Sequence, residues 1–198
     1  MPRGAVDAAV VKNSAAKNPT RSSFAVTSSC TTSEARIRVE YVNPFIESVS
    51  NMFKTMLNTQ VNREDPGVVK HLAPSLDIVA LIGLSGGIRG LVALAFPVRT
   101  VLAMVSKAYG TEIVVVDDRV LDAVAEFVNV VAGGAQARFS DGADTPIDLS
   151  LPAVIRGREF GIVYPSLGTW IEVPFESELG RFVFRVTMKE NNGNKTGR

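Results

Sequence analysis

The sequence has very few of the residues that build metal centres or disulfide frameworks. Its 198 residues include one cysteine, Cys30, and one histidine, His71. A lone cysteine cannot form a disulfide within the chain, and this pair cannot supply a Cys/His zinc cluster. We therefore expect no metal site in this chain and no disulfide scaffold of the kind found in small secreted proteins.

An excess of charge of either sign is also missing, and so is a long hydrophobic run. The 21 basic and 20 acidic residues give a formal net charge of +1, which offers no electrostatic reason to expect nucleic acid or an anionic membrane as a partner. Ala5 to Val11 is only weakly apolar and contains Asp7, so it falls far short of the ~20 residues of a membrane span. We expect neither a signal peptide nor a membrane helix, and a cytoplasmic location.

Apolar side chains are abundant, at 46% of the residues. This share, in a chain of this length, is enough for one sizeable hydrophobic core. Residues 1–36 differ from the rest, because Ser, Thr, Ala, Asn and Lys dominate there and apolar residues follow no period. We expect residues 1–36 to be a disordered extension, residues 37–190 to form one domain, and residues 191–198 to be a flexible tail.

Three helices are expected in the domain. The first is predicted to begin with Asn43 as its cap and Pro44 at its first position, because apolar residues recur at helical spacing after them. The second is predicted to run from Pro97 to a glycine at its carboxyl end. The third follows soon after, with Asp117 or Asp118 as its cap.

The other apolar segments are predicted to be strands. Gly86-Gly87 separates two apolar runs within residues 76–96 and predicts a tight hairpin. Residues 147–155, 169–175 and 181–188 are rich in Val, Ile, Phe and Thr, which favour strands. Together these segments predict an α+β fold, with a mostly antiparallel sheet of about five strands and three helices packed against it.

The hairpin contains a serine that must be considered as a nucleophile. Gly83-Leu-Ser-Gly-Gly87 formally matches the nucleophile elbow of serine hydrolases. That elbow needs a helix directly after the serine and a histidine later in the chain, whereas a strand is expected here and His71 comes earlier. No Gly-Lys-Ser/Thr follows the glycines either, which argues against a phosphate-binding loop. We therefore exclude Ser85 as a nucleophile.

The third helix carries the candidate site. Within the run Val120–Ala135, which otherwise consists of apolar residues and glycines, the polar residues are Asp122, Glu126 and Asn129. Steps of four and three residues place them on one side of a helix, which we call the polar stripe, and Gly133 continues it. An amphipathic helix without a function also has polar residues outside. However, such faces usually pair acids with Lys or Arg, and this one has no cation, which favours a functional site.

The spacing Asp-x-x-x-Glu-x-x-Asn, followed by a glycine-rich helix end, resembles the active-site helix of the CheX and CheC chemotaxis phosphatases. Four other segments resemble the CheX branch in the same order along the chain, and the resemblance covers about residues 37 to 189. These segments are Tyr41–Ile46, Gly83–Gly87, Leu151–Val154 and Ile171–Gly180.

This resemblance implies an enzyme that hydrolyses the aspartyl phosphate of a CheY-like receiver domain in chemotaxis signalling. It implies that Asn129 positions the attacking water and that Glu126 pairs with the receiver's active-site lysine, so that both are candidate catalytic residues. Asp122 and Gly133 would contact the partner. The Mg²⁺ ion would sit in the receiver, and this chain would bind no cofactor itself.

The resemblance also separates the two branches of the family. In the CheC branch the first helix would carry a second site, but here the residue three before Asn51 is Ser48, and Glu47 is one position off. The second site is therefore expected to be absent, and Glu47 and Asn51 are expected to be ordinary surface residues. This favours the single-site CheX type.

Assembly and two other functions stay open at this stage. CheX resemblance implies a homodimer whose sheets join, and the apolar strands 169–175 and 181–188 are expected to offer an edge for it. Alternatively, Arg181, Arg185 and Lys189 would keep one face of the last strand solvated and the chain monomeric.

The domain could also be a non-catalytic module that binds a receiver, or a structural module like those of flagellar switch proteins. The latter would be expected to lack the Glu-Asn pair.

Overall fold

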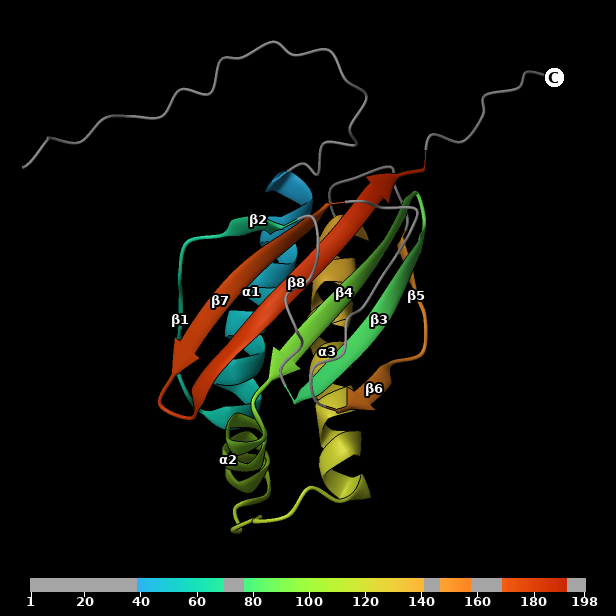
Figure 1. Ribbon diagram of the computed structural model, residues 1–198. Helices are drawn as coiled ribbons and strands as arrows, with labels where there is room; N and C mark the ends of the chain where they lie inside the picture. Colours follow the sequence, from blue (N-terminus) through green and yellow to red (C-terminus); the bar gives the residue numbers. More distant parts are fainter. Residues whose placement is uncertain (1–38, 70–76, 141–146, 158–168, 192–198) are drawn as a thin grey trace, which may run out of the picture. The chain divides into compact units, whose positions relative to one another are not determined.

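The structure is a computed structural model, and it describes residues 39–69, 77–140, 147–157 and 169–191. The expected disordered extension, residues 1–36, lies outside the described residues, as does the expected tail beyond its first residue. In the described part, three helices accompany one sheet of eight strands (Figure 1). The helices are α1 (Val39–Leu57), α2 (Val98–Tyr109) and α3 (Asp118–Ser140).

The strands form one antiparallel sheet with the order β1-β7-β8-β4-β3-β5, in which β2 also pairs with β7 and β6 with β3. The predicted α+β fold is confirmed, although about five strands was too few. The strands are β1 (Val61–Arg63), β2 (Gly67–Val69), β3 (Ile78–Gly86), β4 (Ile88–Phe96), β5 (Ile147–Leu149), β6 (Ala153–Arg156), β7 (Trp170–Ser177) and β8 (Gly180–Glu190).

The difference in strand number has two causes. The predicted strand 147–155 is divided into β5 and β6 around Ser150, whose hydroxyl accepts a hydrogen bond from Gly83 N at 2.8 Å and donates one to Leu151 O at 2.9 Å. Pro152 follows and cannot donate to a ladder. The strands β1 and β2 have only three residues each and are mostly exposed, so they show no apolar alternation in the sequence.

The predicted hairpin is confirmed. Strands β3 and β4 pair from Ile78 with Phe96 to Leu84 with Gly90. Gly86, at the end of β3, has φ of 92°, a backbone conformation that residues with a side chain rarely adopt. The turn at Gly86 therefore fixes the register in which β3 and β4 pair.

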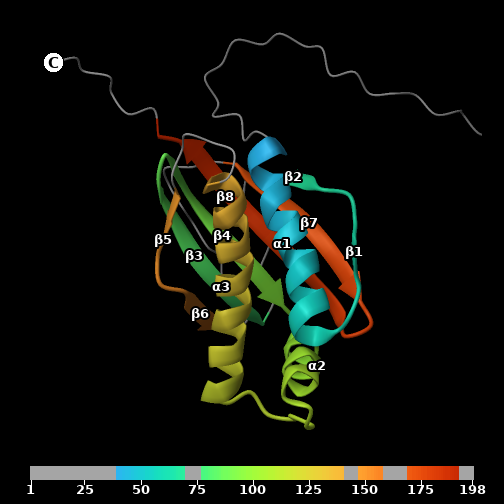
Figure 2. The same cartoon turned by 180° about the vertical axis from the view of Figure 1, so that it is seen from behind.

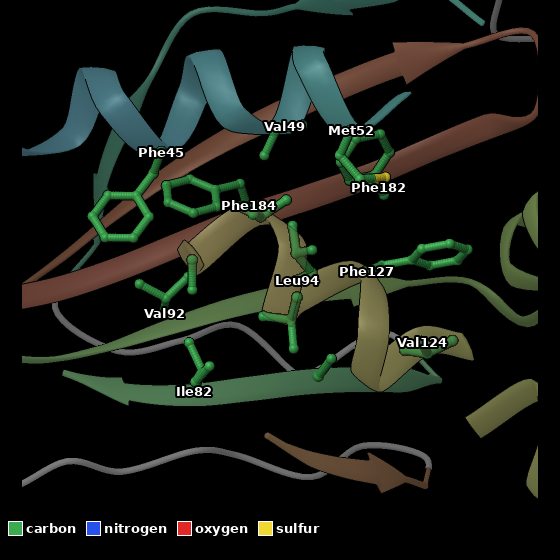
Figure 3. Packing of buried hydrophobic residues seen from close by; sticks show 14 of the residues in the cluster. Phe45, Val49, Met52, Ile82, Val92, Leu94, Val124, Phe127, Phe182 and Phe184 are labelled. Carbon is green, nitrogen blue, oxygen red and sulfur yellow. The ribbon is translucent and has the colours of Figure 1, made fainter. Parts of the chain in front are cut away.

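Helices α1 and α3 lie side by side on one face of the sheet (Figures 1 and 2). The core fills the space between them and the sheet, as Figure 3 shows for side chains such as Phe45 on α1, Phe127 on α3 and Phe184 on β8. Phe182 of β8 stacks on Phe53 of α1 at a centroid distance of 4.8 Å. The inner face of each helix is thus committed to the core, and only the outer face remains for a partner.

The predicted start of the first helix is wrong. Within the described residues α1 begins at Val39, and Pro44 lies inside it. An interior proline removes a backbone hydrogen bond and costs about 3 kcal/mol. However, Val42 and Phe45 on either side of the proline are both buried. The apolar face therefore continues through Pro44, and its packing outweighs the lost bond.

The predictions for α2 are confirmed. Pro97 occupies its N-cap position, and Val98 N donates a hydrogen bond to Asp77 Oδ2 at 3.0 Å. At the other end Gly110 is left-handed, with φ of 65°, and its N–H bonds Ser106 O. This C-cap turns the chain from α2 into the link that leads to α3.

The C-terminal strands do not form an open edge, so that part of the sequence analysis is wrong. Strand β8 lies between β7 and β4, and the outer side of β7 is partly covered by β1 and β2. The alternative was that Arg181, Arg185 and Lys189 keep one face of the last strand solvated. It also fails in part, because Arg185 is only 4% exposed and its Nε donates to Glu172 Oε2 of β7 at 2.7 Å. The homodimer itself stays a prediction.

Candidate active site

The site-bearing helix α3 begins as the sequence predicts. Asp117 caps it, because its Oδ1 accepts a hydrogen bond from Val120 N at 3.1 Å. Its Oδ2 accepts bonds from Arg119 Nε and Nη2 at 3.0 and 2.8 Å. These bonds, that of Arg119 first, hold the pKa of the Asp117 carboxyl below its ordinary value. The cap therefore fixes where the helix starts, and with it the direction of every later side chain.

One face of α3 belongs to the core. Val120, Val124, Phe127, Val128 and Val131 are buried, whereas Leu121 beside them is half-buried. By length and composition α3 could cross a membrane, the one such helix in the described ranges. Its packing against α1 and the sheet identifies it as a core helix.

The polar stripe lies on the opposite face, as predicted. Asp122, Glu126 and Asn129 are all exposed. Asn129 Nδ2 lies 3.5 Å from Glu126 Oε2, which is a long and weak hydrogen bond. Among the described residues neither carboxylate of the stripe forms a salt bridge. The stripe therefore presents two acids and a carboxamide whose hydrogen-bonding groups are available to a partner.

The two glycines after the stripe differ. A Cβ added to Gly133 would meet no atom within 4 Å, so this position is open on the outer side. A Cβ on Gly134 would lie 2.9 Å from the hydroxyl of Ser48, which is buried in α1. Gly134 therefore allows the two helices to approach closely, whereas Gly133 leaves room beside the stripe. The contact of Gly134 with Ser48 was not predicted, although a glycine in a helix interior was its signal.

The residues considered for a second site lie on helix α1. Glu47 and Asn51 are exposed, which confirms the prediction that they are surface residues. Glu47 forms a salt bridge with Arg138 near the end of α3. Ser48 is buried under Gly134. Glu47 of α1 therefore forms a salt bridge with α3, whereas Glu126 of α3 forms none with the described residues of α1.

Other candidate chemistry lies away from the stripe. Ser85 stands on β3, and the turn after it leads into strand β4, so the nucleophile elbow is absent; His71 lies outside the described residues. No group of three or more His, Cys, Asp or Glu side chains in the described ranges is arranged to hold a metal ion. A hollow of about 480 Å³ opens at the carboxyl end of α1, beside Lys54 and Asn58, and does not include the stripe.

The fold of the chain is that of CheC-like and CheX proteins of known structure. Residues 78–176 match the family described as chemotaxis phosphatase CheX. The chain belongs to this family.

Individual relatives agree with this assignment. A protein of Thermotoga maritima described as CheY-P phosphatase CheX is 29% identical over 134 residues, which are 67% of this chain and 84% of the relative. The crystal structure of a CheC-like superfamily protein from Shewanella sp. PV-4 has a TM-score of 0.71 and 31% identity, covering 77% of this chain and 99% of that one. Chemotaxis protein CheX from Vibrio vulnificus has a TM-score of 0.69 and 28% identity, with 76% and 99% covered.

Proposed function

We propose that this chain is a phosphatase that hydrolyses the aspartyl phosphate of a CheY-like response regulator in chemotaxis signalling. The family and the Thermotoga maritima relative described as a CheY-P phosphatase support this activity. The structural observation that carries it is the free polar stripe on α3. A convex helix face suits a protein substrate, because such a substrate brings its own pocket around the reacting group.

The proposed division of labour follows from the chemistry of an acyl phosphate. The receiver would hold the phosphoryl group and a Mg²⁺ ion, so the phosphatase must mainly place a water in line with the phosphorus. The water's oxygen bonds to phosphorus as the bond to the receiver's aspartate oxygen breaks. The aspartate leaves as a carboxylate, and the protons of the water leave with the released inorganic phosphate. This chain would supply no cofactor of its own.

Asn129 is the residue we assign to the water. Its carboxamide offers an acceptor and two donors without a charge, so it can orient a water beside an anionic phosphoryl group. Its long bond to Glu126, at 3.5 Å, leaves these groups available. A carboxylate at this position would repel the phosphoryl group and compete for the metal ion.

Glu126 is assigned to docking. It lies one turn before Asn129 on the same exposed side and has no salt bridge among the described residues. An unpaired exposed carboxylate there suits a charge-assisted bond to the receiver's active-site lysine. Asp122 would contact the rim of the receiver, and the open space at Gly133 would accommodate its backbone.

We also propose a cytoplasmic homodimer. Response regulators are phosphorylated inside the cell, where their phosphatase must meet them. In the sheet, the outer edges of β5 and β6 at one end and of β1 and β2 at the other are the flanks at which a second copy could pair. Light scattering at micromolar concentration should give the dimer mass, and a monomer mass across a tenfold dilution would reject the dimer without touching the proposed activity.

The activity is tested with purified chain and a panel of phosphorylated receivers. Phosphate release should be faster with the chain than without it for at least one receiver. Binding without faster release would instead favour a non-catalytic receiver-binding module. If the chain neither binds nor dephosphorylates any receiver of the panel, the proposed function is contradicted.

A further inference from the structure

The link between α2 and α3 exposes several apolar side chains close together. Six large hydrophobic residues are exposed in the described ranges, and three of them, Tyr109, Val114 and Val115, lie in one stretch of seven residues. Tyr109 is 56% exposed, Val114 69% and Val115 66%. Single exposed hydrophobic residues are ordinary, but a group of them in one segment marks a contact surface.

The exposure of the two valines is built into the link. Ile113 N donates a hydrogen bond to Ser106 Oγ at 2.8 Å, and Arg156 Nη1 of β6 donates to Val116 O at 3.1 Å. Ile113 packs against the core, and Val116 is only 8% exposed. Since these two residues take the inner positions, Val114 and Val115 cannot turn inward without breaking both anchors. The apolar side chains are therefore held outward in advance of any binding.

The link leads directly into the site-bearing helix, as Figures 1 and 2 show. Three residues at ~3.8 Å each put the Cα of Val115 within about 11 Å of that of Asp118. Asp122 follows one helical turn later, ~6 Å along the axis. Glu112, Asp118 and Asp122 are exposed along this passage, and the exposed Arg119 between them is paired with Asp117. The apolar segment and the polar stripe thus adjoin, and one partner can cover both.

The stripe alone is too small to dock a protein. A specific interface buries roughly 800 Å² on each partner, and its affinity comes mainly from apolar or aromatic anchors near its centre. Asp122, Glu126 and Asn129 supply charge and hydrogen bonds but no such anchor. Tyr109 and the two valines of the link supply one beside an acidic rim, which suits a partner surface with apolar side chains next to a lysine.

We infer that Tyr109, Val114 and Val115 form the apolar part of the surface that docks the receiver domain, continuous with the polar stripe. This inference rests on the proposed function and assigns binding and the reaction step to different residues. The link determines how tightly the receiver binds, and Asn129 determines how fast the bound receiver loses its phosphoryl group.

The test compares three full-length chains by titration with one receiver, the one of the panel that the wild type binds most tightly. Beryllofluoride and Mg²⁺ hold this receiver in a state that mimics its phosphorylated form. The double variant Val114→Ser/Val115→Ser should bind about tenfold more weakly than the wild type. Its phosphate release at saturating phosphorylated receiver should be unchanged. Val68→Ser is the matched control, because Val68 is 73% exposed on β2, at the far end of the molecule from the link (Figure 1). It should bind like the wild type, and all three chains should melt alike.

The outcomes separate the docking surface from the activity. Equal affinity of the wild type and the double variant overturns the docking surface, whatever the activity. Weaker binding by the double variant, with no phosphate release even by the wild type, supports the docking surface and overturns the proposed activity. A wild type that binds no receiver overturns both. A double variant that loses only self-association assigns the valines to a second copy of this chain and overturns the inference.

Discussion

Helices α1 and α3 lie side by side on the same face of the sheet, and each carries a glutamate and an asparagine on its exposed side. On α1 the pair is Glu47 and Asn51, and on α3 it is Glu126 and Asn129. Glu47 is held by Arg138 of α3, whereas Glu126 has only the long contact to Asn129. The two helices therefore carry similar residues, but among the described residues only the glutamate of α1 forms a salt bridge.

The difference shows that residue types alone do not define a site of this kind. Spacings of three and of four residues both place such a pair on one face of a helix, so spacing alone does not separate the two pairs. In α1 the neighbouring Ser48 is buried against α3, so this part of the helix serves packing. Helix α3 therefore carries the proposed function, and α1 supports it.

Reversing the charge of each glutamate should give the largest difference in effect between the two helices. Glu126→Lys puts a cation opposite the receiver's lysine, so turnover at low receiver concentration should fall about 100-fold or more. Glu47→Lys breaks a half-exposed salt bridge with Arg138, which should lower the free energy of unfolding by less than about 1 kcal/mol and leave receiver binding unchanged. Titration and chemical unfolding measure the two effects. Unchanged binding by Glu126→Lys would remove its docking role.

The two glycines give a second, smaller contrast. Gly133→Ala fills open space and should raise the free energy of unfolding by up to about 1 kcal/mol, through helix propensity. Gly134→Ala should show no such gain, because its Cβ would press on the Ser48 hydroxyl at 2.9 Å. Adding Ser48→Ala to Gly134→Ala should recover the gain. The same stability for both single variants would mean that α1 does not need the close approach.

The smallest effect concerns the cap that orients α3. Because the folded pKa of Asp117 lies below its usual value of 3.8, its charge stabilises the fold above that pH, and the contribution disappears as pH falls through the folded pKa. Asp117→Asn keeps a cap acceptor but loses the charged bond to Arg119. Its melting temperature should be slightly lower than that of the wild type at pH 7 and equal to it in strong acid. A constant difference across this range would show that the charge is not involved.

The polar stripe and the hairpin could be predicted because both depend on local rules. The exposed face of Asp122, Glu126 and Asn129 follows from helical periodicity, and the turn at Gly86 follows from the conformations that glycine allows. The contact of Gly134 with Ser48 of α1 could not be predicted, since it depends on which helix packs beside α3. The predicted helix start at Pro44 was wrong because a local rule was outweighed by packing on both sides of the proline.

The order of strands was beyond the sequence pattern. Strand β8 is central because it pairs with β4 as well as β7, and nothing within residues 181–188 records that second pairing. Arg185 illustrates the consequence, because it lies between Ala93 of β4 and Glu172 of β7 and is only 4% exposed. The short strands β1 and β2 exist through pairing with β7 more than through their own residues. Long-range pairing, and not local propensity, accounts for each of these differences.

The most direct test is the rate of phosphate release from one phosphorylated receiver, at saturating concentration, with the wild type, Asn129→Ala and Asn51→Ala. Saturation removes differences in binding, so any difference that remains lies in the reaction step. Both asparagines are exposed, and neither substitution should lower the melting temperature. We predict a loss of about 100-fold or more for Asn129→Ala, since the attacking water is no longer positioned, and no change for Asn51→Ala. A rate for Asn129→Ala close to that of the wild type would contradict the assignment of the site to α3.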